Sequence, residues 1–391
     1  MKSRSNWFWI LLCVGGIGAL TVLAVVAFVA WAYFDLTKFN RLSDTHDLRD
    51  RTQKLAETYL SKRTSGALVV GVVQNGKLKW LGFGQVTPGS TSAPDSETIF
   101  EIGSVTKVFT AIALAQLAGD GKLKLDDTLA ERLPAKVTLP EALRPITLVQ
   151  LATHTSGLAR LPGNLDLSDA NATDPYVRYT SKELYEYLQT ARLDSPPGKK
   201  STYSNLGVGL LGHILELRAE IPYEQLLRDR ILVPLGMADT AITLSPGQQA
   251  RLTPGHDAKG QVVSNWNFDV LAPAGALRSC VGDLLKFIQA NLALTNHTGL
   301  DPALKLAQKP HFESWTGNVG LCWQIFDAPG LYRFHWHNGG TGGYASFLAF
   351  DRQHQTGVVL LSNYGDAMAG DNSLDNMGME LLKLAAKVSW E

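Results

Sequence analysis

The sequence reads Phe100-Glu101-Ile102-Gly103-Ser104-Val105-Thr106-Lys107 at the start of an apolar segment that ends at Gly121. Apolar residues recur in it at helical spacing, which predicts a helix that begins at or near Ser104. Three residues are just under one helical turn, so Lys107 lies on the same face of this helix as Ser104. Burial lowers the pKa of a lysine and enables its amine to take the proton of a nearby hydroxyl. The segment therefore predicts a serine nucleophile with an adjacent base.

A second motif, Tyr203-Ser204-Asn205, lies on a loop that enters a predicted helix over Leu206 to Leu217. Alternate residues of an extended segment point the same way, so Tyr203 and Asn205 are expected to face one cleft. A tyrosine near cations acts as a general base, and an uncharged asparagine amide donates to a substrate carbonyl. The alternative is an ordinary helix entry, with Asn205 as the cap and Tyr203 in the core.

A third motif is rich in glycine and lies between two segments that alternate like strands: His335-Trp336-His337-Asn338-Gly339-Gly340-Thr341-Gly342-Gly343-Tyr344. Glycines such as Gly339 and Gly340 let a backbone approach a ligand closely. His337 is expected to recognise a substrate carboxylate or carbonyl, and the Gly340 N–H to complete an oxyanion hole. The alternative is a plain glycine-rich hairpin. The presence of all three motifs in this order favours a single active site.

These motifs resemble the serine β-lactamase and penicillin-binding-protein superfamily, most closely its class C β-lactamase-like hydrolases. The resemblance implies that Ser104 forms an acyl-enzyme, that Lys107 and Tyr203 share proton transfer, and that Asn205 binds the substrate amide. It also implies an oxyanion hole made by the backbone N–H groups of Ser104 and Gly340. Further similar stretches are Leu151-Ala152-Thr153-His154-Thr155-Ser156-Gly157-Leu158, Leu210-Leu211-Gly212, Pro234-Leu235-Gly236-Met237 and Pro273-Ala274-Gly275.

The chain departs from this family's usual pattern in two places. It has His337-Asn338-Gly339 where the β-lactamases usually carry Lys-Thr-Gly or Lys-Ser-Gly. A histidine is only partly charged near neutrality, so we expect it to hold a substrate carboxylate less firmly than a lysine. The second departure is Leu321-Cys322-Trp323, where a glycine usually precedes the tryptophan.

The expected fold class is α/β, of the serine β-lactamase and D,D-peptidase type, with an antiparallel sheet, flanking helices and an inserted, mostly helical region. The α/β part is expected at about 45–125 and 280–391 and the helical part at about 126–279, within a hydrolase domain of residues 41–391. A hairpin around Asn75-Gly76 is predicted by turn chemistry. The other predicted strands are Phe347 to Phe350 and Gly357 to Leu361, and the other predicted helices are Lys182 to Ala191, Val281 to Leu292 and Leu374 to Val388.

Residues 1–40 are predicted to be a membrane anchor and a short linker. No charged residue occurs from Trp7 to Phe34, a run long enough to cross a bilayer as a helix. Lys2 and Arg4 precede it, which favours a cytoplasmic N-terminus and a single-pass protein of the bacterial cytoplasmic membrane with its catalytic domain on the periplasmic side. The alternative is a cleaved signal peptide, since Ala30-Trp31-Ala32 resembles a cleavage site.

Composition narrows the functional classes. The 391 residues carry no formal net charge and no basic run, which argues against a nucleic-acid partner. Cys280 and Cys322 allow at most one disulfide in the soluble part and require none. Gly207 to Gly212 matches a dinucleotide fingerprint, but no apolar strand precedes it, so close helix packing is the better interpretation. His335 and His337 lack further ligands at metal-binding spacing, and we expect neither metal nor cofactor.

Together these observations predict a membrane-anchored serine hydrolase that cleaves amides of D-amino-acid peptides, such as those of peptidoglycan, through an acyl-enzyme. β-Lactams are expected to be poor substrates or slow acylating inhibitors. One alternative is a class C-like carboxylesterase that uses the same residues on an ester. The other is a penicillin or muropeptide sensor that is acylated without turnover, since deacylation depends on where a water is held.

Overall fold

The computed structural model describes residues 47–63, 66–87, 89–168, 173–314, 317–328, 332–365 and 373–390. Within these ranges, the centre of the molecule is an antiparallel sheet of eight strands in the order β2-β1-β12-β11-β10-β9-β8-β7. Strands from the two ends of the chain therefore meet in one sheet. Its members are β1 (Ala67–Gln74), β2 (Lys77–Gly84), β7 (Phe312–Ser314), β8 (Gly317–Val319), β9 (Gln324–Ala328), β10 (Tyr332–Gly340), β11 (Ala345–Asp351) and β12 (Thr356–Ser362).

The predicted hairpin and the late strands are confirmed. Gln74 pairs with Lys77 across a two-residue turn, in which Asn75 and Gly76 have φ values of 50° and 76°. Positive φ at both central positions matches the right-handed twist of the two strands, and asparagine and glycine are the residues that adopt it most readily. β12 then pairs with β1 over Leu68 to Gln74, which builds the long-range part of the sheet.

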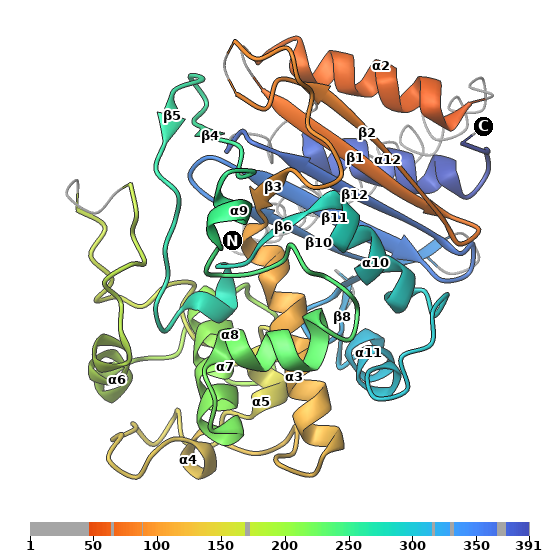
Figure 1. Ribbon diagram of the computed structural model, residues 1–391. Coiled ribbons are helices and arrows are strands. Elements are labelled where there is room, and N and C mark those ends of the chain that lie inside the picture. Colours follow the sequence, from red (N-terminus) through yellow and green to blue (C-terminus); the bar gives the residue numbers. More distant parts are fainter. Residues whose placement is uncertain are drawn as a thin grey trace, which may run out of the picture.

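Helices cover both faces of the sheet, as Figure 1 shows. One face packs a hydrophobic cluster against α2 (Leu48–Leu60) and α12 (Leu374–Ala385). The opposite face packs a larger cluster against α3 (Thr106–Gly119), α10 (Val281–Asn291) and α11 (Asp301–Gln308). Because β1, β11 and β12 are buried on both faces, their sequences are nearly continuous apolar runs. The predicted antiparallel sheet between helices is therefore present.

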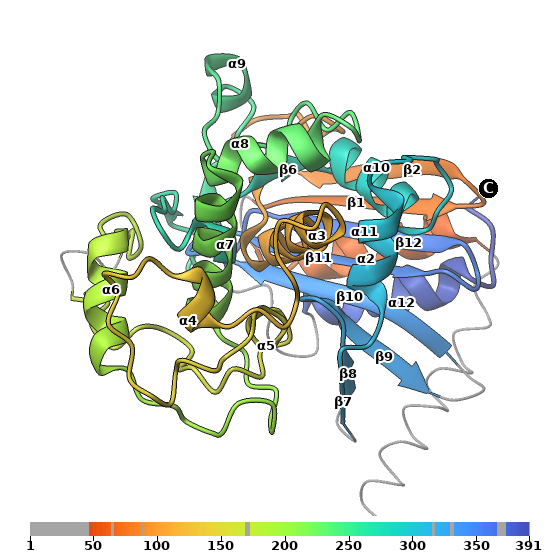
Figure 2. The same cartoon turned by 90° about the horizontal axis from the view of Figure 1, so that it is seen from below.

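The segment between α3 and α10 was predicted to be mostly helical, but loops make up most of it, and helices are only its commonest regular elements. Most of these helices lie beside α3, away from the sheet (Figure 2). Two two-stranded pairings interrupt or border this segment, β4 (Gly255–His256) with β5 (Val262–Val263) and β6 (Arg278–Cys280) with β3 (Ile99–Glu101). Its helical elements are α4 (Leu129–Arg132), α5 (Leu148–Ala152), α6 (Ser181–Thr190), α7 (Asn205–Ala219), α8 (Tyr223–Leu227), η3 (Arg228–Leu232), α9 (Pro246–Gln249) and η4 (Ala272–Ala274).

The glycines of α7 serve close packing. A Cβ added at Gly209 would lie 2.4 Å from Leu271 Cδ2, and one added at Gly212 would lie 2.1 Å from Pro273 Cγ. Both contacts are too short for a side chain, so these glycines let α7 approach the segment that leads into η4. The glycines between Gly207 and Gly212 therefore lie inside a helix and serve packing, as the sequence predicts, and do not form a dinucleotide-binding turn.

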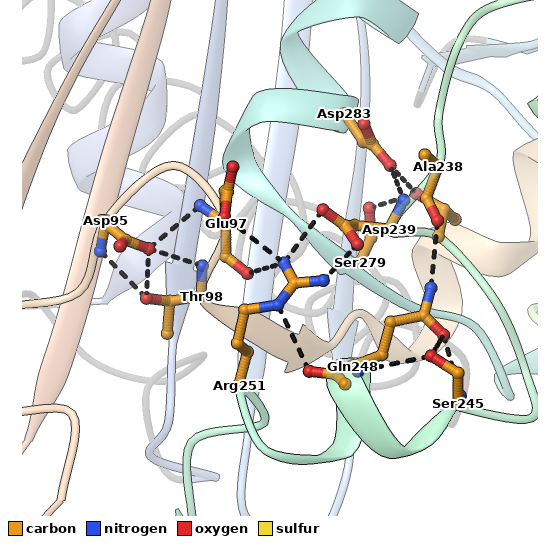
Figure 3. A network of polar contacts seen from close by, with 12 residues as sticks. Asp95, Glu97, Thr98, Ala238, Asp239, Ser245, Gln248, Arg251, Ser279 and Asp283 are labelled. Atoms are coloured by element: carbon orange, nitrogen blue, oxygen red, sulfur yellow. Dashed lines mark hydrogen bonds and ion pairs between the residues drawn. The ribbon is translucent and has the colours of Figure 1, made fainter.

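A polar network joins the helical region to the α/β part (Figure 3). The Arg251 guanidinium donates to Asp239 Oδ2 at 2.9 Å and to the backbone oxygen of Glu97, just before β3, at 2.9 Å. The Asp239 backbone N–H donates in turn to Asp283 in the first turn of α10 at 2.7 Å. These contacts fix the loop around α9 against β3, whose end leads into Ser104.

The predicted anchor from Trp7 to Phe34 lies outside the described residues. Within the part of the chain that is described, no helix has the length and apolar character needed to cross a membrane. The domain limits proposed from the sequence stay predictions. Cys280 and Cys322 are both buried free thiols, so the one disulfide that the sequence allowed is not formed.

Candidate active site

Ser104 lies in η2 (Gly103–Val105), a short turn between β3 and α3. The N-cap of α3 is Val105, so the serine precedes the helix proper, slightly before the start expected from the sequence. Gly103 has φ +48°, and a Cβ there would lie 2.7 Å from the Gly340 nitrogen. Glycine at this position therefore allows the turn that carries Ser104 to pack directly on the end of β10.

Lys107 is placed as predicted, on the same face as Ser104 and one turn along. Its Nζ lies 3.0 Å from Ser104 Oγ and donates to the Ala274 backbone oxygen at 2.5 Å. The side chain is 0% exposed. Burial, helped by the charge of Arg160, lowers the pKa of Lys107 to about 7. Near neutrality a large share of this lysine is therefore uncharged and has a lone pair for the serine proton.

Tyr203 completes the predicted constellation. Its hydroxyl is hydrogen-bonded to the Ser104 side chain, and its ring centre lies 4.8 Å from Lys107 Nζ. Burial raises the pKa of Tyr203 above its ordinary value, and the bond to Ser104 offsets this only in part. The phenol is consequently protonated at neutral pH. The sequence left open which of the two groups is the base, and their charge states favour Lys107.

His154 supports Tyr203 from behind, a role that sequence reasoning missed. Their ring centres are 4.6 Å apart, and the His154 Nδ1 accepts from the Ser204 backbone N–H at 3.2 Å. Burial holds the pKa of His154 well below its usual range, so the ring is neutral. The available signal is that His154 lies in one of the stretches that resemble the family, Leu151 to Leu158.

His337 lies near Tyr203, with ring centres 6.3 Å apart, yet it is only 1% exposed. Burial and the charge of Lys107 lower the pKa of His337 to about 3, so the partial positive charge expected from the sequence is absent at neutral pH. The Nδ1 of the ring lies 2.6 Å from the Asn338 carbonyl oxygen. A carbonyl only accepts, so Nδ1 carries the proton and Nε2 presents a lone pair.

Asn205, Gly339 and Gly340 surround the nucleophile. Asn205 and Gly340 line the same cavity as Ser104. Gly339 lies behind the serine, where an added Cβ would be 2.9 Å from the Ser104 nitrogen and 2.1 Å from the Ile102 oxygen. The structure thus brings all the predicted residues to one place. Their assigned roles in substrate binding and in an oxyanion hole stay predictions.

The cavity at Ser104 is covered by three aromatic side chains that were not predicted. Tyr176 stacks on Phe268 with ring centres 4.6 Å apart and meets Trp266 edge-on at 5.3 Å. All three line the cavity, whose volume is about 20 Å³. Such a space holds about one water molecule. The three aromatic side chains, called the aromatic cover below, therefore leave little space beside Ser104, whose side chain is half-buried.

Polar residues hold the cover in place. Glu101 accepts from the Trp266 backbone N–H at 3.0 Å, and Arg278 donates to the Trp266 oxygen at 3.0 Å. Asp174 accepts from both the backbone and the side-chain N–H groups of Asn267, each at 2.8 Å. Asp174 thereby joins the segment before Tyr176 to the part of the cover around Asn267.

The second departure from the family pattern has a conformational explanation. Cys322 has φ +57°, in the left-handed region that glycine adopts without strain. Its backbone N–H donates to the Ala152 oxygen at 2.8 Å, and its side chain is fully buried. Burial raises the pKa of this thiol to about 12, so it stays protonated. A glycine is the expected residue at this position for backbone reasons alone.

The described residues contain no group of three or more histidine, cysteine, aspartate or glutamate side chains able to hold a metal ion. His335 is used structurally, since its Nε2 lies 2.9 Å from the Gln308 backbone oxygen and burial lowers its pKa to about 4.

Comparisons with known proteins identify the family of this chain. A family model described as Beta-lactamase matches residues 52–376. The D-alanyl-D-alanine-carboxypeptidase/endopeptidase AmpH of Escherichia coli K12 is 31% identical over 319 residues, covering 78% of this chain and 80% of that protein. A Beta-lactamase of Pseudomonas fluorescens is 25% identical over 348 residues, covering 81% of this chain and 94% of that protein.

Solved structures establish the same fold. A Beta-Lactamase/D-Alanine Carboxypeptidase from Pseudomonas syringae superposes with a TM-score of 0.76 at 21% identity, covering 86% of this chain and 98% of that one. The D-alanine Carboxypeptidase AmpC from Burkholderia cenocepacia gives a TM-score of 0.73 at 23% identity over the same shares.

Proposed function

Because the chain belongs to the beta-lactamase family and is a serine hydrolase of the beta-lactamase and D,D-carboxypeptidase type, we propose that it cleaves amide bonds in peptides that carry D-amino acids. The observation that carries this proposal is the contact between the buried Lys107 amine and Ser104 Oγ, with the Tyr203 hydroxyl bonded to the same serine. β-Lactams acylate the same serine and are turned over slowly.

In the first step, neutral Lys107 takes the Ser104 proton as Oγ attacks the substrate carbonyl. The carbonyl oxygen gains a negative charge, which the backbone N–H groups of Ser104 and Gly340 stabilise. The proton then passes from Lys107 through the Tyr203 hydroxyl to the leaving amine, and the C–N bond breaks. Water attacks the acyl-enzyme in the second step and gives up a proton to the same pair. The pair returns this proton to Ser104 Oγ as the C–Oγ bond breaks, which releases the acid and restores the free serine.

A carboxylesterase is the second candidate, and one observation favours it. His337 is buried and uncharged and offers a lone pair, so it provides no electrostatic attraction for a substrate carboxylate. An esterase needs no such attraction, whereas a carboxypeptidase acts on a chain that ends in a carboxylate. The two candidates therefore differ in how strongly a carboxylate on the substrate raises kcat/KM.

Intact mass of the protein from about Asp35 onward tests the mechanism and separates the candidates. The protein is incubated with a β-lactam, with an acylated D-alanyl-D-alanine peptide and with phenyl acetate, each beside Ser104→Ala. Peptide cleavage together with a β-lactam adduct that Ser104→Ala abolishes supports the proposal. Turnover of phenyl acetate alone favours the esterase, and a stable adduct without any turnover favours a sensor. No adduct and no turnover contradicts the catalytic assignment.

We further propose that the enzyme is anchored in the cytoplasmic membrane by the uncharged run from Trp7 to Phe34 and acts on the periplasmic side. Support comes from the length of this run and from the proposed substrate, which occurs in the cell wall. Fractionation of cells that express the full chain, with and without residues 1–40, tests the anchor. Release of the full chain in a shortened, soluble form would instead indicate a cleaved signal peptide.

A further inference from the structure

A peptide that ends in a free D-amino acid carries a carboxylate. His337, the residue that the sequence predicts to bind this group, is unsuitable for it. His337 donates from Nδ1 to the Asn338 carbonyl, so its Nε2 offers a lone pair, which repels a carboxylate. Lys107 is occupied between Ser104 and the Ala274 oxygen and serves as the base. Recognition of a carboxylate thus requires another cation at this site.

Arg160 is such a cation. Its guanidinium carbon lies 5.0 Å from the centre of the Tyr203 ring, and the residue is exposed to solvent. Burial dominates the pKa of Lys107, His154 and Tyr203, and the charge of Arg160 acts on all three. The guanidinium therefore lies at the mouth of the active site and not on a remote surface.

The backbone of Arg160 is fixed to the motif that carries Tyr203. Its carbonyl oxygen accepts from the Asn205 backbone N–H at 2.9 Å, and the preceding Ala159 oxygen accepts from Ser204 Oγ at 2.7 Å. The arginine side chain thus starts from a point tied to the first turn of α7. Tyr203 delivers the proton to the leaving amine in the proposed mechanism, so the leaving group lies on the side of Arg160.

The Arg160 guanidinium is also uncommitted. None of the ion pairs or side-chain hydrogen bonds between the described residues includes it. Asp174, a carboxylate next to the aromatic cover, is already bonded through both oxygens to Asn267. The planar guanidinium can therefore offer two parallel N–H groups to an incoming carboxylate.

We propose that Arg160 binds the carboxylate of the leaving group and thereby determines specificity for peptides that end in a free D-amino acid. This inference rests on the proposed function for its natural substrate. The inference also applies to other substrates, because any leaving group that bears a carboxylate in the same position is favoured. Phenol esters with and without a carboxylate on the ring therefore test it independently of peptides.

The experiment measures kcat and KM for two matched pairs of substrates. One pair is an acyl-D-alanyl-D-alanine peptide and its C-terminal amide, and the other is 3-carboxyphenyl acetate and phenyl acetate. The variants are Arg160→Gln, Arg160→Lys and the control Arg218→Gln. Arg218 is an exposed arginine on α7, thirteen residues beyond Asn205 and thus about 20 Å along the helix.

We expect Arg160→Gln to lower kcat/KM for the free carboxylates by about 10- to 100-fold, mainly through KM, because a charge-assisted, bidentate contact is lost. The uncharged partner of each pair should change less than about 3-fold, since it makes no such contact. Arg160→Lys should recover part of the loss because it keeps the charge without the planar fork. Arg218→Gln should leave both pairs unchanged.

An equal loss on both members of a pair would overturn the inference, because it would indicate a structural effect on Tyr203. An unchanged preference for the carboxylates in Arg160→Gln would overturn it as well. If the unaltered enzyme cleaves neither peptide but prefers 3-carboxyphenyl acetate in an Arg160-dependent way, the proposed peptidase function fails and the inference stands. If it shows no preference for a carboxylate in either pair, the inference fails even where peptides are cleaved.

Discussion

The Nζ of Lys107 lies 3.0 Å from Ser104 Oγ in a position that is wholly buried. The lysine donates one further hydrogen bond, to the Ala274 oxygen, and no ion pair between the described residues compensates its charge. Burial without a counter-charge favours the neutral amine. Burial of Lys107 therefore activates Ser104 as a nucleophile, and it destabilises the folded protein when the amine is protonated.

The rate of acylation should rise with pH around the pKa of Lys107. Below about pH 7 the amine is protonated and unable to accept the serine proton, and above it the amine is free. We expect kcat/KM for phenyl acetate to follow a single ionisation with a midpoint near pH 7 and to reach a plateau before Tyr203, whose pKa is raised, ionises. A flat profile from pH 5 to 9 would contradict the assignment of Lys107 as the base.

Lys107→Met should abolish acylation while stabilising the protein. The amine has a pKa of about 7 in the folded protein and 10.5 as the ordinary value, so the unfolded chain binds more protons between these limits. The free energy of unfolding of the unaltered protein therefore increases as the pH rises from 7 to 10.5. Below pH 7 the buried amine destabilises the folded protein to the full extent. We expect Lys107→Met to raise the free energy of unfolding by up to about 5 kcal/mol there.

The gain from Lys107→Met is measured by urea unfolding at pH 6 and at higher pH. It should decrease steadily toward pH 10.5, where the amine is neutral in both states. A gain that is independent of pH would show that packing of the methionine, and not the buried charge, causes the stabilisation.

Gly339→Ala should disable the nucleophile with a moderate loss of stability. The added Cβ would lie 2.1 Å from the Ile102 oxygen and 2.9 Å from the Ser104 nitrogen, so the turn η2 has to shift. A displacement of about 1 Å costs on the order of 100-fold in rate. Overpacking costs about 1 to 3 kcal/mol. Acylation kinetics and thermal unfolding measure the two effects.

Gly119→Ala is the matched control, since nothing lies within 4 Å of a Cβ at this position in α3. It should keep full activity and unfold at the same or a slightly higher temperature, because alanine favours the helix. Full activity in Gly339→Ala would mean that the contact between β10 and η2 is not needed to position Ser104.

Asp174→Ala should loosen the aromatic cover. Asp174 is joined to Asn267 by two hydrogen bonds of 2.8 Å, and Trp266 and Phe268 flank Asn267. Since the cover leaves little space beside Ser104, a looser cover should admit a bulky substrate more readily, and we expect acylation by a bulky β-lactam to become about 3- to 10-fold faster. Stopped-flow acylation measures this, with Asp126→Ala, an exposed carboxylate elsewhere, as the control. Slower acylation would indicate that the cover helps to bind the substrate.

Cys322→Gly should be at least as stable as Cys322→Ala. At an ordinary loop position alanine is the more stable of the two by about 0.4 to 1 kcal/mol. Cys322 has φ +57°, where a Cβ costs about 1 to 2 kcal/mol, so the usual order is cancelled or reversed. Urea midpoints of the two variants decide the matter. A clear advantage for alanine would show that the surrounding structure relaxes to a negative φ.

Much of the fold and of the catalytic set was predictable because its signals are local. The turn at Asn75-Gly76, the apolar strands and the helix after Ser104 each depend on a few neighbouring residues. Ser104 and Lys107 are linked by the period of a helix, which is a property of the chain itself. The aromatic cover was missed because Trp266 and Phe268 carry no periodic signal and act only through contact with Tyr176.

The sequence by itself determined the hairpin at Asn75-Gly76, the late strands and the helix after Ser104, and it predicted the residues of the candidate site. Only the tertiary structure decided their charge states. Lys107 contacts Ser104 and also donates to the backbone oxygen of Ala274, which is 167 residues away in the chain. Burial of Lys107 and Ser104 depends on segments from the whole chain. A pKa follows from desolvation and from nearby charges, and neither can be read from spacing. For the same reason His337 proved uncharged, and Arg160 emerged as the available cation.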